Sequence, residues 1–364
     1  MWSHESLSSD VDRALQRLCQ AEDVAAVAAM PDVHLASDIC IGTVVATTKT
    51  LYPAAVGGDI GCGMAAMKLV GQADVQAAAD RIFQALPEVV PIIRHSKGQV
   101  LLDELSAQPL SGSALEKKRA ILAPGQLGTL GRGNHFLEVQ ADDEAGLWLM
   151  IHSGSRAIGP AIRDHHLKAA TRRKGGFKGL DVDSEAGKAY LSDVNWALEY
   201  AAENRRRMMR AAVEIFEVLL DLSADESSFF GCHHNDVQRE EIGGEMLWVH
   251  RKGAVSARRG ELGIIPGSMG TESFHVEGRG NEAALNSSSH GAGRCLSRSA
   301  AFRRISSEAL KAQMTGICFD HRLAPRLRDE APSAYKDVSK VMRAQKDLTR
   351  IIRRLRPLLV YKGV

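Results

Sequence analysis

Four short motifs rich in glycine and histidine carry side chains that metal ions prefer. VGGDIGCGM offers Asp59 and Cys62, GRGNHFLEV offers His135, LMIHSGSRAIG offers His152, and GCHHNDV offers His234. One carboxylate, one thiolate and three imidazoles suffice for two divalent ions if the thiolate bridges them. Cysteine and histidine are the usual ligands of zinc, so this chemistry predicts a transition metal without choosing which one.

Each of these motifs also has a plainer interpretation when it is taken alone. A glycine-rich turn often holds a small buried cysteine, and a lone histidine at a strand end is usually a structural residue. The four motifs together favour the metal site. Each histidine then needs a partner for its second ring nitrogen, and the neighbours Asn134, His233 and Asn235 are the candidates.

A fifth motif, SSSHGAGRCLSR, surrounds His290 with small residues. An imidazole can attack the α-phosphorus of a nucleotide and form a phosphoramidate. Gly291 and Gly293 would let phosphates come close, and Arg294 would neutralise charge in the transition state. Alone, the motif is more typical of a tight turn that contains a histidine by chance.

A longer glycine- and serine-rich segment, VHRKGAVSARRGELGIIPGSMGTESF, contains Lys252, Gly267, Ser268, Gly270 and Ser273. Glycine N–H groups and serine hydroxyls suit the phosphates and base of a nucleotide. The chain has neither a GxxxxGK[ST] loop nor a KxDG motif. Any covalent nucleotide transfer must therefore use a nucleophile other than the lysine of the KxDG ligases.

The elements that would position these motifs alternate between strands and helices. Val11, Leu15 and Leu18 predict a helix over residues 10–29 that gives way at MPDVH, where Pro31 disfavours helix. Apolar runs that begin at residues 41, 147 and 246 predict strands, and residues 186–220 predict one or two long helices. Because no βαβ rhythm is present, the fold class is predicted to be α+β.

Composition is that of an ordinary folded protein. Of 364 residues, 45% are hydrophobic and 25% are charged, and no run of about 18 apolar residues or secretory leader is seen. We therefore expect a cytoplasmic protein without a membrane segment. The six cysteines form no CxxC pair, which argues against a disulfide framework. The net charge of +2 does not by itself indicate a nucleic-acid-binding protein. Basic runs lie at 172–174, 205–210, 303–304 and 350–356, and they fit either a phosphate track or solvated helix faces.

The motifs together resemble, in type and in order, the RtcB family of RNA-splicing ligases. The resemblance runs from Met30 to Gly363 through MPDVHLASDICIGTVVAT, YPAAVGGDIGCGM, GTLGRGNHFLEV, LMIHSGSRAIG, HHN, RKGA, IIPGSMGT, SHGAGR, DEAPSAYKDVSKVM and VYKG. It implies a single catalytic domain over residues 1–364, with mixed β-sheets surrounded by helices. It also implies a monomer that ligates an RNA 3′-phosphate or 2′,3′-cyclic phosphate to a 5′-hydroxyl, with GTP and two Mn²⁺ ions, in tRNA splicing or RNA repair.

The resemblance also implies roles for individual residues. His290 matches the histidine that accepts GMP, which then passes to the RNA 3′-phosphate and is displaced by the 5′-hydroxyl. The implied metal ligands are Asp59, Cys62 as the bridge, His135, His152 and His234. The implied guanylate site comprises Asn134, Phe136, Glu138, Asn235, Ser268, Ser273, Gly291, Ala292, Gly293 and Lys362. The basic residues expected near phosphates are Arg156, Lys252 and Arg294.

Two departures from the family pattern and two rival functions accompany this interpretation. Ser37, Asp38, Ile39 and Cys40 stand where the family has a glycine-rich stretch, and can alter the entrance to the site. The chain is also short around residues 101–122 and 175–184, which suggests a shorter bacterial paralogue with a narrower substrate, such as a damaged tRNA or rRNA. The rivals are a metal-dependent cyclic-phosphate hydrolase or phosphodiesterase that never ligates, and a non-catalytic RNA-binding paralogue.

Overall fold

The largest sheet of the computed structural model is curled so that its two end strands contact each other. The structure describes residues 1–2, 6–36 and 38–364. Within this sheet the strand order is β13 (Leu262–Ile265), β14 (Ser273–Gly278), β17 (Thr349–Lys362), β5 (Phe136–Asp142), β6 (Leu147–Ser153), β4 (Gly63–Val70) and β9 (Ser223–His233), and β16 (Cys318–Phe319) pairs with β17. Contacts between β13 and β9 bring the ends together.

A second, antiparallel sheet lies beside the first and continues directly from it. Its order is β1 (Val24–His34), β2 (Ile41–Thr47), β11 (Glu245–Lys252) and β10 (Asn235–Ile242). Because β9 ends at His233 and β10 begins at Asn235, the chain crosses between the sheets at His234. Two small sheets complete the strands: β3 (Thr50–Leu51), β8 (Lys178–Asp181) and β7 (Thr171–Arg172) in one, and β12 (Ala254–Ser256) with β15 (Ser287–Ser289) in the other.

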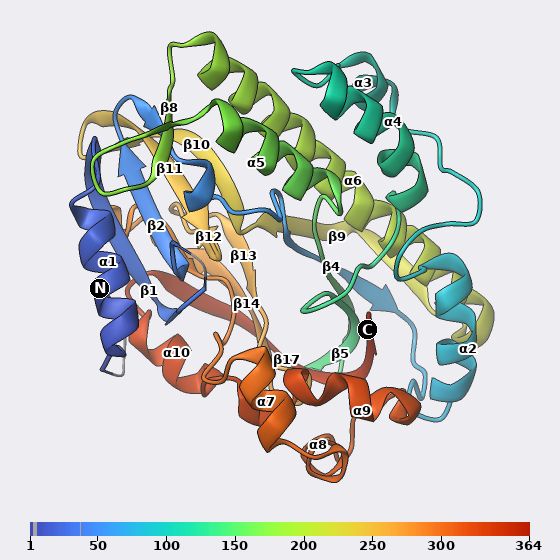
Figure 1. Cartoon of the computed structure of the whole chain (residues 1–364). Helices are drawn as coiled ribbons and strands as arrows, with labels where there is room; N and C mark the ends of the chain where they lie inside the picture. Colours follow the sequence, from blue (N-terminus) through green and yellow to red (C-terminus); the bar gives the residue numbers. More distant parts are fainter. Residues whose placement is uncertain (3–5, 37) are drawn as a thin grey trace.

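Helices surround these sheets on several sides (Figure 1). The longest is α6 (Glu185–Leu220), which packs against α2 (Ala79–Val89), α5 (Ile158–Ala169) and the large sheet. The others are α1 (Ser9–Cys19), α3 (Asp103–Ala107), α4 (Ser113–Gln126), α7 (Arg298–Arg304), α8 (Ser307–Gln313), α9 (Ala324–Leu327) and α10 (Val338–Ala344). Short 3₁₀ turns cover 53–55, 282–284, 321–323, 328–330 and 332–334. Among the described residues, no helix combines the length and apolar character needed to cross a bilayer.

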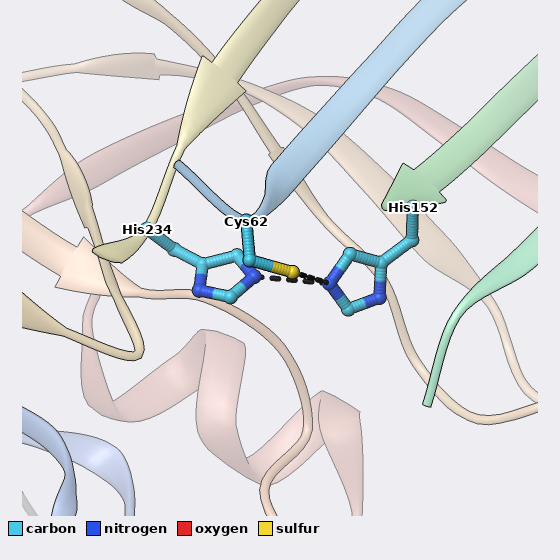
Figure 2. Close-up of side chains that lie close together, drawn as sticks. All are labelled: Cys62, His152 and His234. Atoms are coloured by element: carbon cyan, nitrogen blue, oxygen red, sulfur yellow. Dashed lines mark hydrogen bonds between the residues drawn. The ribbon is translucent and has the colours of Figure 1, made fainter. Parts of the chain in front are cut away.

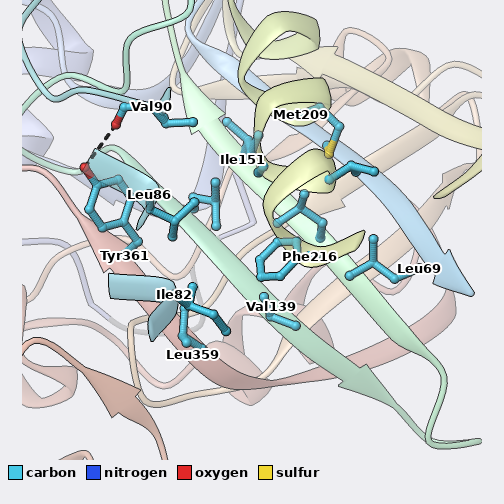
Figure 3. Close-up of a cluster of buried hydrophobic side chains, with 14 of the residues drawn as sticks. Leu69, Ile82, Leu86, Val90, Val139, Ile151, Met209, Phe216, Leu359 and Tyr361 are labelled. Atoms are coloured by element: carbon cyan, nitrogen blue, oxygen red, sulfur yellow. Dashed lines mark hydrogen bonds between the residues drawn. The ribbon is translucent and has the colours of Figure 1, made fainter. Parts of the chain in front are cut away.

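The main hydrophobic core lies between the large sheet and the helices α2 and α6 (Figure 3). Leu86 of α2, Phe216 of α6 and Ile151 of β6 are all fully buried there. The hydroxyl of Tyr361 on β17 donates to the carbonyl of Val90 at 3.0 Å, which ties the last strand to the end of α2. This core fixes the sheet on the side away from the glycine- and histidine-rich motifs.

The α+β class and most of the predicted elements are confirmed. The strands expected from residues 41, 147 and 246 are β2, β6 and β11, and the pattern over 186–220 is one continuous helix, α6. Ser184 caps the start of α6 by accepting from the N–H of Gly187, and Asp221 ends it in the left-handed conformation at φ 55°.

The helix predicted over residues 10–29 is wrong beyond Cys19. Residues 24–34 form β1, and Pro31 lies inside this strand rather than ending a helix. Ala26, Val27 and Ala28 pair with Ala46, Val45 and Val44 of β2. Tertiary pairing outweighs the helix propensity of the alanines here. The turn before β1 places Asp23 at φ 60°, and its carboxylate accepts from the backbone N–H groups of residues 48–50.

We predict that Phe216→Ala lowers the free energy of unfolding by about 3–5 kcal/mol, because it leaves a cavity in the main core. Val218→Ala on the same helix is the control, since Val218 is 81% exposed and the expected change is within about 0.5 kcal/mol. Urea unfolding followed by circular dichroism measures both. Equal losses in the two variants would contradict this account of the core.

Candidate active site

The predicted metal ligands lie at the ends of neighbouring strands of the large sheet. Cys62 directly precedes β4, His152 is the penultimate residue of β6, and His234 directly follows β9. In the sheet β4 lies between β6 and β9, and Gly63 pairs with both Ser153 and His233. Three ligands separated by up to 172 positions in sequence therefore meet at one edge.

The ligand atoms converge closely enough to share cations (Figure 2). Cys62 Sγ lies 3.2 Å from His152 Nε2, which is 2.9 Å from His234 Nε2. On its other side Cys62 Sγ lies 3.4 Å from His135 Nε2, which is 2.9 Å from Asp59 Oδ2. Within each of the two groups, Cys62–His152–His234 and Asp59–Cys62–His135, the ligand atoms lie within 4.8 Å of one another. Cys62 belongs to both groups, so the donor set fits two cations that share the sulfur.

The electrostatics of this cluster suit a positive ion. Burial and the neighbouring positive groups hold the pKa values of His152 and His234 well below the usual range, so both rings are in the neutral form that binds metal. Burial and the carboxylate of Asp59 raise the pKa of the Cys62 thiol well above its usual range. A bound cation reverses that preference and releases the thiol proton.

Glycines at two positions permit the convergence. A Cβ added at Gly63 would overlap the carbonyl oxygen of Cys232, and one at Gly154 would overlap the carboxylate of Asp59. Any larger residue at these positions would push β9 or Asp59 away from the cluster. The glycines of GCGM and HSGSR are thus needed for close packing of the ligand-bearing segments.

The expected partners of the histidine rings are only partly those observed. His135 Nδ1 lies 2.9 Å from the carbonyl oxygen of Leu130, so the backbone orients this ring and Asn134, His233 and Asn235 do not. Asn235 interacts with the ring of His234, as expected, and acts to raise the pKa of that ring. Its side chain also donates to the Asp59 carbonyl at 2.9 Å and accepts from the N–H of Gly253. It therefore supports the loop that carries the carboxylate ligand.

His290 lies beside the cluster and is oriented by a buried carboxylate. Its Nδ1 is 2.7 Å from Asp32 Oδ2, and its backbone N–H donates to the same oxygen at 3.1 Å. The fully buried Asp32 therefore keeps the proton on Nδ1 and leaves the lone pair of Nε2 free. The ring centroids of His290 and His234 are 4.8 Å apart. Asp32 belongs to MPDVH, a motif from which the sequence analysis drew no site residue.

Gly293 has a different role from the one expected. It has φ +73°, and an added Cβ would overlap the carbonyl oxygen of Asp32. This glycine lets the SHGAGR segment lie directly on β1, which brings His290 to Asp32. Gly291 has more room, since the nearest atom to an added Cβ is the Pro266 oxygen at 3.2 Å.

A cavity beside His290 gathers most of the predicted nucleotide-site residues. Its lining includes Asn134, Phe136, Glu138, His152, Ser268, His290, Gly291, Ala292, Gly293, Arg294 and Lys362. Four further lining residues with polar or charged side chains were not predicted as site residues, namely His34, Arg298, Glu330 and Tyr335. The last two belong to DEAPSAY, a motif that the sequence analysis matched as a whole without assigning residues.

Four of the residues predicted to surround the nucleotide or its phosphates lie outside the lining of this cavity. Ser273 is behind it, where its hydroxyl accepts from the N–H of Gly267 at 3.3 Å. Arg156 lies behind the metal cluster, with Nη1 3.3 Å from His135 Nδ1. Lys252 donates to the carbonyl of Ile39 at 2.9 Å, and Asn235 supports the Asp59 loop as described. The structure therefore places these side chains around the reaction site rather than in the cavity.

The segment that departs from the family pattern lies next to Lys252 and α1. Ser37 is outside the described residues. Asp38 is exposed, and its carbonyl accepts from the guanidinium of Arg17 at 3.2 Å, whereas Ile39 and Cys40 are buried.

The comparisons with known proteins agree with this geometry. A family model described as tRNA-splicing ligase RtcB matches residues 15–123 and 107–363. The chain belongs to the RtcB family. It is 38% identical over 371 residues to RNA-splicing ligase RtcB1 of Escherichia coli ATCC 25922, covering 93% of this chain and 90% of that protein. The RNA-splicing ligase RtcB of Escherichia coli K12 is equally similar. The tRNA-splicing ligase RtcB of Methanococcus maripaludis is 29% identical over 422 residues, with coverages of 92% and 87%.

In this RtcB-family chain, one buried carboxylate organises the cations of the cavity. Glu330 lies 2.6 Å from Lys362 Nζ, 2.6 Å from Arg298 Nη1 and 3.3 Å from Arg294 Nη1. The two arginines contact Oε1, whereas Tyr335 donates at 2.8 Å to Oε2, the oxygen that Lys362 also contacts. Burial acts to raise the pKa of Glu330, but these cations outweigh it and lower that pKa. The ionised Glu330 thus fixes Lys362 and Arg294 at two places along the cavity wall.

For a second carboxylate in the cavity of this RtcB-family chain, Glu138, the neighbouring groups do not outweigh the effect of burial on the pKa. Burial raises the pKa of Glu138 to about 8, against the opposing effects of Gln140 and Lys362. Gln140 donates to the carboxylate at 2.8 Å. Glu138 is therefore protonated to a large extent at neutral pH and gains charge when a hydrogen-bond donor reaches it.

We predict that Glu138→Gln gains stability relative to the wild-type chain as pH rises. The folded state holds this proton more tightly than the unfolded state, so the wild-type chain loses stability between about pH 5 and about pH 8. The difference in free energy of unfolding is expected to grow by a few kcal/mol at most, at about 1.4 kcal/mol per pKa unit. Urea unfolding at several pH values measures it. The exposed Glu144→Gln is the control and is expected to run parallel to wild type; a parallel curve for Glu138→Gln would refute the prediction.

Proposed function

We propose that this chain is an RNA ligase that joins an RNA 3′-phosphate or 2′,3′-cyclic phosphate to a 5′-hydroxyl, using GTP and two Mn²⁺ ions. One catalytic domain over residues 1–364 acts as a monomer on cleaved tRNA or rRNA, in splicing or repair. The observation that carries the proposal is the position of His290. Its ring is oriented by Asp32, it lines the cavity, and it lies 4.8 Å from the ring of His234. Membership of the RtcB family supports the same function.

The first step is transfer of GMP to the enzyme. His290 Nε2 attacks the α-phosphorus of GTP, an N–P bond forms, the bond from that phosphorus to the bridging oxygen breaks, and pyrophosphate leaves. Asp32 stabilises the ring through the Nδ1 proton, as the aspartate of a serine-protease triad does. Arg294, held by Glu330 and by the carbonyl of Asp329 at 2.6 Å, faces the same cavity and offsets phosphate charge.

The second and third steps use the GMP group to activate the RNA end. A 3′-phosphate oxygen attacks the phosphorus on His290, the N–P bond breaks, and the RNA end now carries GMP through a pyrophosphate link. The 5′-hydroxyl then attacks the RNA phosphorus, a phosphodiester forms and GMP leaves with the bonding electrons. A cyclic phosphate first consumes one water to give the 3′-phosphate. The activation is needed because a 3′-phosphate dianion has no leaving group of its own.

The residues of the metal cluster suit the charge that these steps accumulate. Asp59, Cys62 and His135 would hold one ion, and Cys62, His152 and His234 the other. When bound, divalent ions neutralise phosphate charge and polarise phosphoryl oxygens. The donor chemistry alone also suits zinc, and manganese is proposed from the family resemblance.

The nucleotide base is assigned to the end of the cavity that holds Glu138 and Lys362. A guanine offers N–H donors on one edge, and Glu138 is a buried acceptor that becomes charged when such donors approach. Lys362 Nζ lies 5.6 Å from the centroid of the Phe136 ring, which leaves an aromatic face beside the charged groups. Ser268 and the backbone of residues 291–293 line the remaining wall.

We predict that the wild-type chain becomes labelled by GTP carrying the label on the α-phosphorus, in the presence of Mn²⁺. The link is expected to be labile to acid and stable to base, as a phosphoramidate is, and His290→Ala is expected to abolish it. His321→Ala is the control, since His321 is exposed and stacks on Phe319 away from the cavity. Unchanged labelling of His290→Ala would remove His290 as the nucleophile. Opening of a cyclic phosphate without GTP and without labelling would favour the hydrolase alternative.

We predict that Asp32→Asn slows the labelling by about a thousandfold, because the amide no longer enforces the proton on Nδ1. Single-turnover labelling at saturating GTP and Mn²⁺ measures the rate. Asp38→Asn is the control, because Asp38 is exposed and faces Arg17. A labelling rate of Asp32→Asn within a few-fold of wild type would show that Asp32 does not orient His290.

A further inference from the structure

Two consecutive side chains of α6, Asn204 and Arg205, lie directly behind the metal cluster. Arg205 is 2% exposed and Asn204 is fully buried, near the middle of a 36-residue helix. In the sequence Arg205 belongs to the basic run 205–210, which fits either a phosphate track or a solvated helix face. The structure supports neither for this residue, because its guanidinium points into the protein.

Arg205 contacts one chain neighbour of each ligand in the Cys62–His152–His234 group. Nη1 donates to the carbonyl of Gly61 at 2.9 Å and to the carbonyl of Ser153 at 2.8 Å. Nη2 faces His233 Nδ1 at 3.2 Å. Gly61 adjoins Cys62, Ser153 adjoins His152, and His233 adjoins His234. One guanidinium thus connects the ends of β4, β6 and β9 through the residues next to Cys62, His152 and His234.

Asn204 extends the same support to His135. Its Oδ1 accepts from the N–H groups of Gly128 and Thr129 at 2.7 and 3.1 Å. Its Nδ2 donates to the hydroxyl of Ser153 at 3.1 Å. That hydroxyl donates to the Leu130 carbonyl at 2.7 Å, which is also the partner of His135 Nδ1 at 2.9 Å.

The chemistry of these contacts is unusual for a buried cation. Among the described residues no carboxylate forms an ion pair with Arg205, and its guanidinium contacts two carbonyl groups and an imidazole. A buried guanidinium without an anionic partner lowers stability. Its planar fork can nevertheless hold three acceptors in a fixed relative geometry, which the ammonium of lysine cannot do as well.

We propose that Asn204 and Arg205 are positioning residues that assemble the metal centre from α6. This inference rests on the metal site of the proposed function. The candidate metal ligands lie at the ends of β4, β5, β6 and β9 and in the loop before β4. Asn204 and Arg205 form hydrogen bonds with the segments that carry them. The affinity of the centre for its ions therefore depends on α6, which contributes no ligand but orients the segments that carry the ligands.

The test is the affinity of Arg205→Lys for Mn²⁺ alone, measured by isothermal titration calorimetry. We expect the dissociation constant to rise by about tenfold to a hundredfold, the usual effect of removing a group that orients metal ligands. Titration with Co²⁺ gives an independent signature, since the thiolate-to-cobalt absorption of Cys62 is expected to weaken or shift. High Mn²⁺ is expected to restore much of the GTP labelling, because the variant keeps every ligand.

Arg119→Lys is the matched control. Arg119 also donates to a backbone carbonyl, that of Leu105 at 2.7 Å, and to Glu116, but it lies on α4 away from the cluster. We expect its Mn²⁺ affinity to equal that of wild type. Thermal unfolding without metal shows whether each variant is folded.

If Arg205→Lys does not fold, Ser153→Ala tests whether the side chains of α6 position the metal ligands. This change removes one hydroxyl from the path between Asn204 and His135, and weaker Mn²⁺ binding is expected again. Folded variants that bind Mn²⁺ as tightly as wild type would overturn the inference while leaving the proposed function intact. Failure of the wild-type chain to bind Mn²⁺ would instead refute the metal site itself.

Discussion

The close approach of β4 and β9 at Gly63 is the constraint on which the candidate site depends. With any side chain at this position the two strands would separate, because an added Cβ would overlap the carbonyl of Cys232. The pairing of Gly63 with both His233 and Ser153 places Cys62 between His152 and His234. A short sulfur-to-nitrogen distance of 3.2 Å is thus a product of backbone packing and not of the side chains alone.

A second contact joins the two sheets across the site. Asp32 comes from β1 of the smaller sheet, and His290 follows β15, yet the two groups are 2.7 Å apart. The contact requires Gly293, whose lack of a Cβ lets its segment lie on the carbonyl of Asp32. The buried carboxylate keeps a proton on Nδ1 and fixes the direction of the reactive nitrogen. The proposed nucleophile is therefore oriented by the smaller sheet, and most of the candidate metal ligands are held by the larger one.

The residues of the candidate site were easier to predict from the sequence than the contacts that position them. Cys62, the histidines and His290 have chemistry that few other residue types supply, so their motifs were informative when taken together. Asp32 and Glu330 were missed because buried carboxylates gain their roles from partners in other segments, 258 positions away for Asp32 and up to 36 for Glu330, and nothing in MPDVH or DEAPSAY indicates those partners. The buried role of Arg205 was missed for the same reason, because a basic run that fits a phosphate track or a solvated helix face does not reveal what a buried guanidinium contacts.

The fold shows the same division. The long pattern over residues 186–220 and the strands at 41, 147 and 246 depend on local periodicity and were predicted. Residues 24–29 were not, because their alanines suit a helix and only pairing with β2 makes them a strand. The correction is relevant to function, since the strand formed in this way carries Asp32.

The crossing of the chain between the two sheets at His234 links the two halves of the site thermodynamically. His234 is a candidate metal ligand on one side and is covalently continuous with β10 on the other. Any shift of one sheet against the other changes the distance between the candidate metal ligands and the proposed nucleophile, His290, which Asp32 of β1 orients. Under the proposed function, free energy released by ion binding would help to align His290, and nucleotide binding would alter ion affinity by the same factor as ion binding alters nucleotide affinity. The metal ions and the nucleotide would then each change the affinity for the other through the backbone of His234, where the two sheets join.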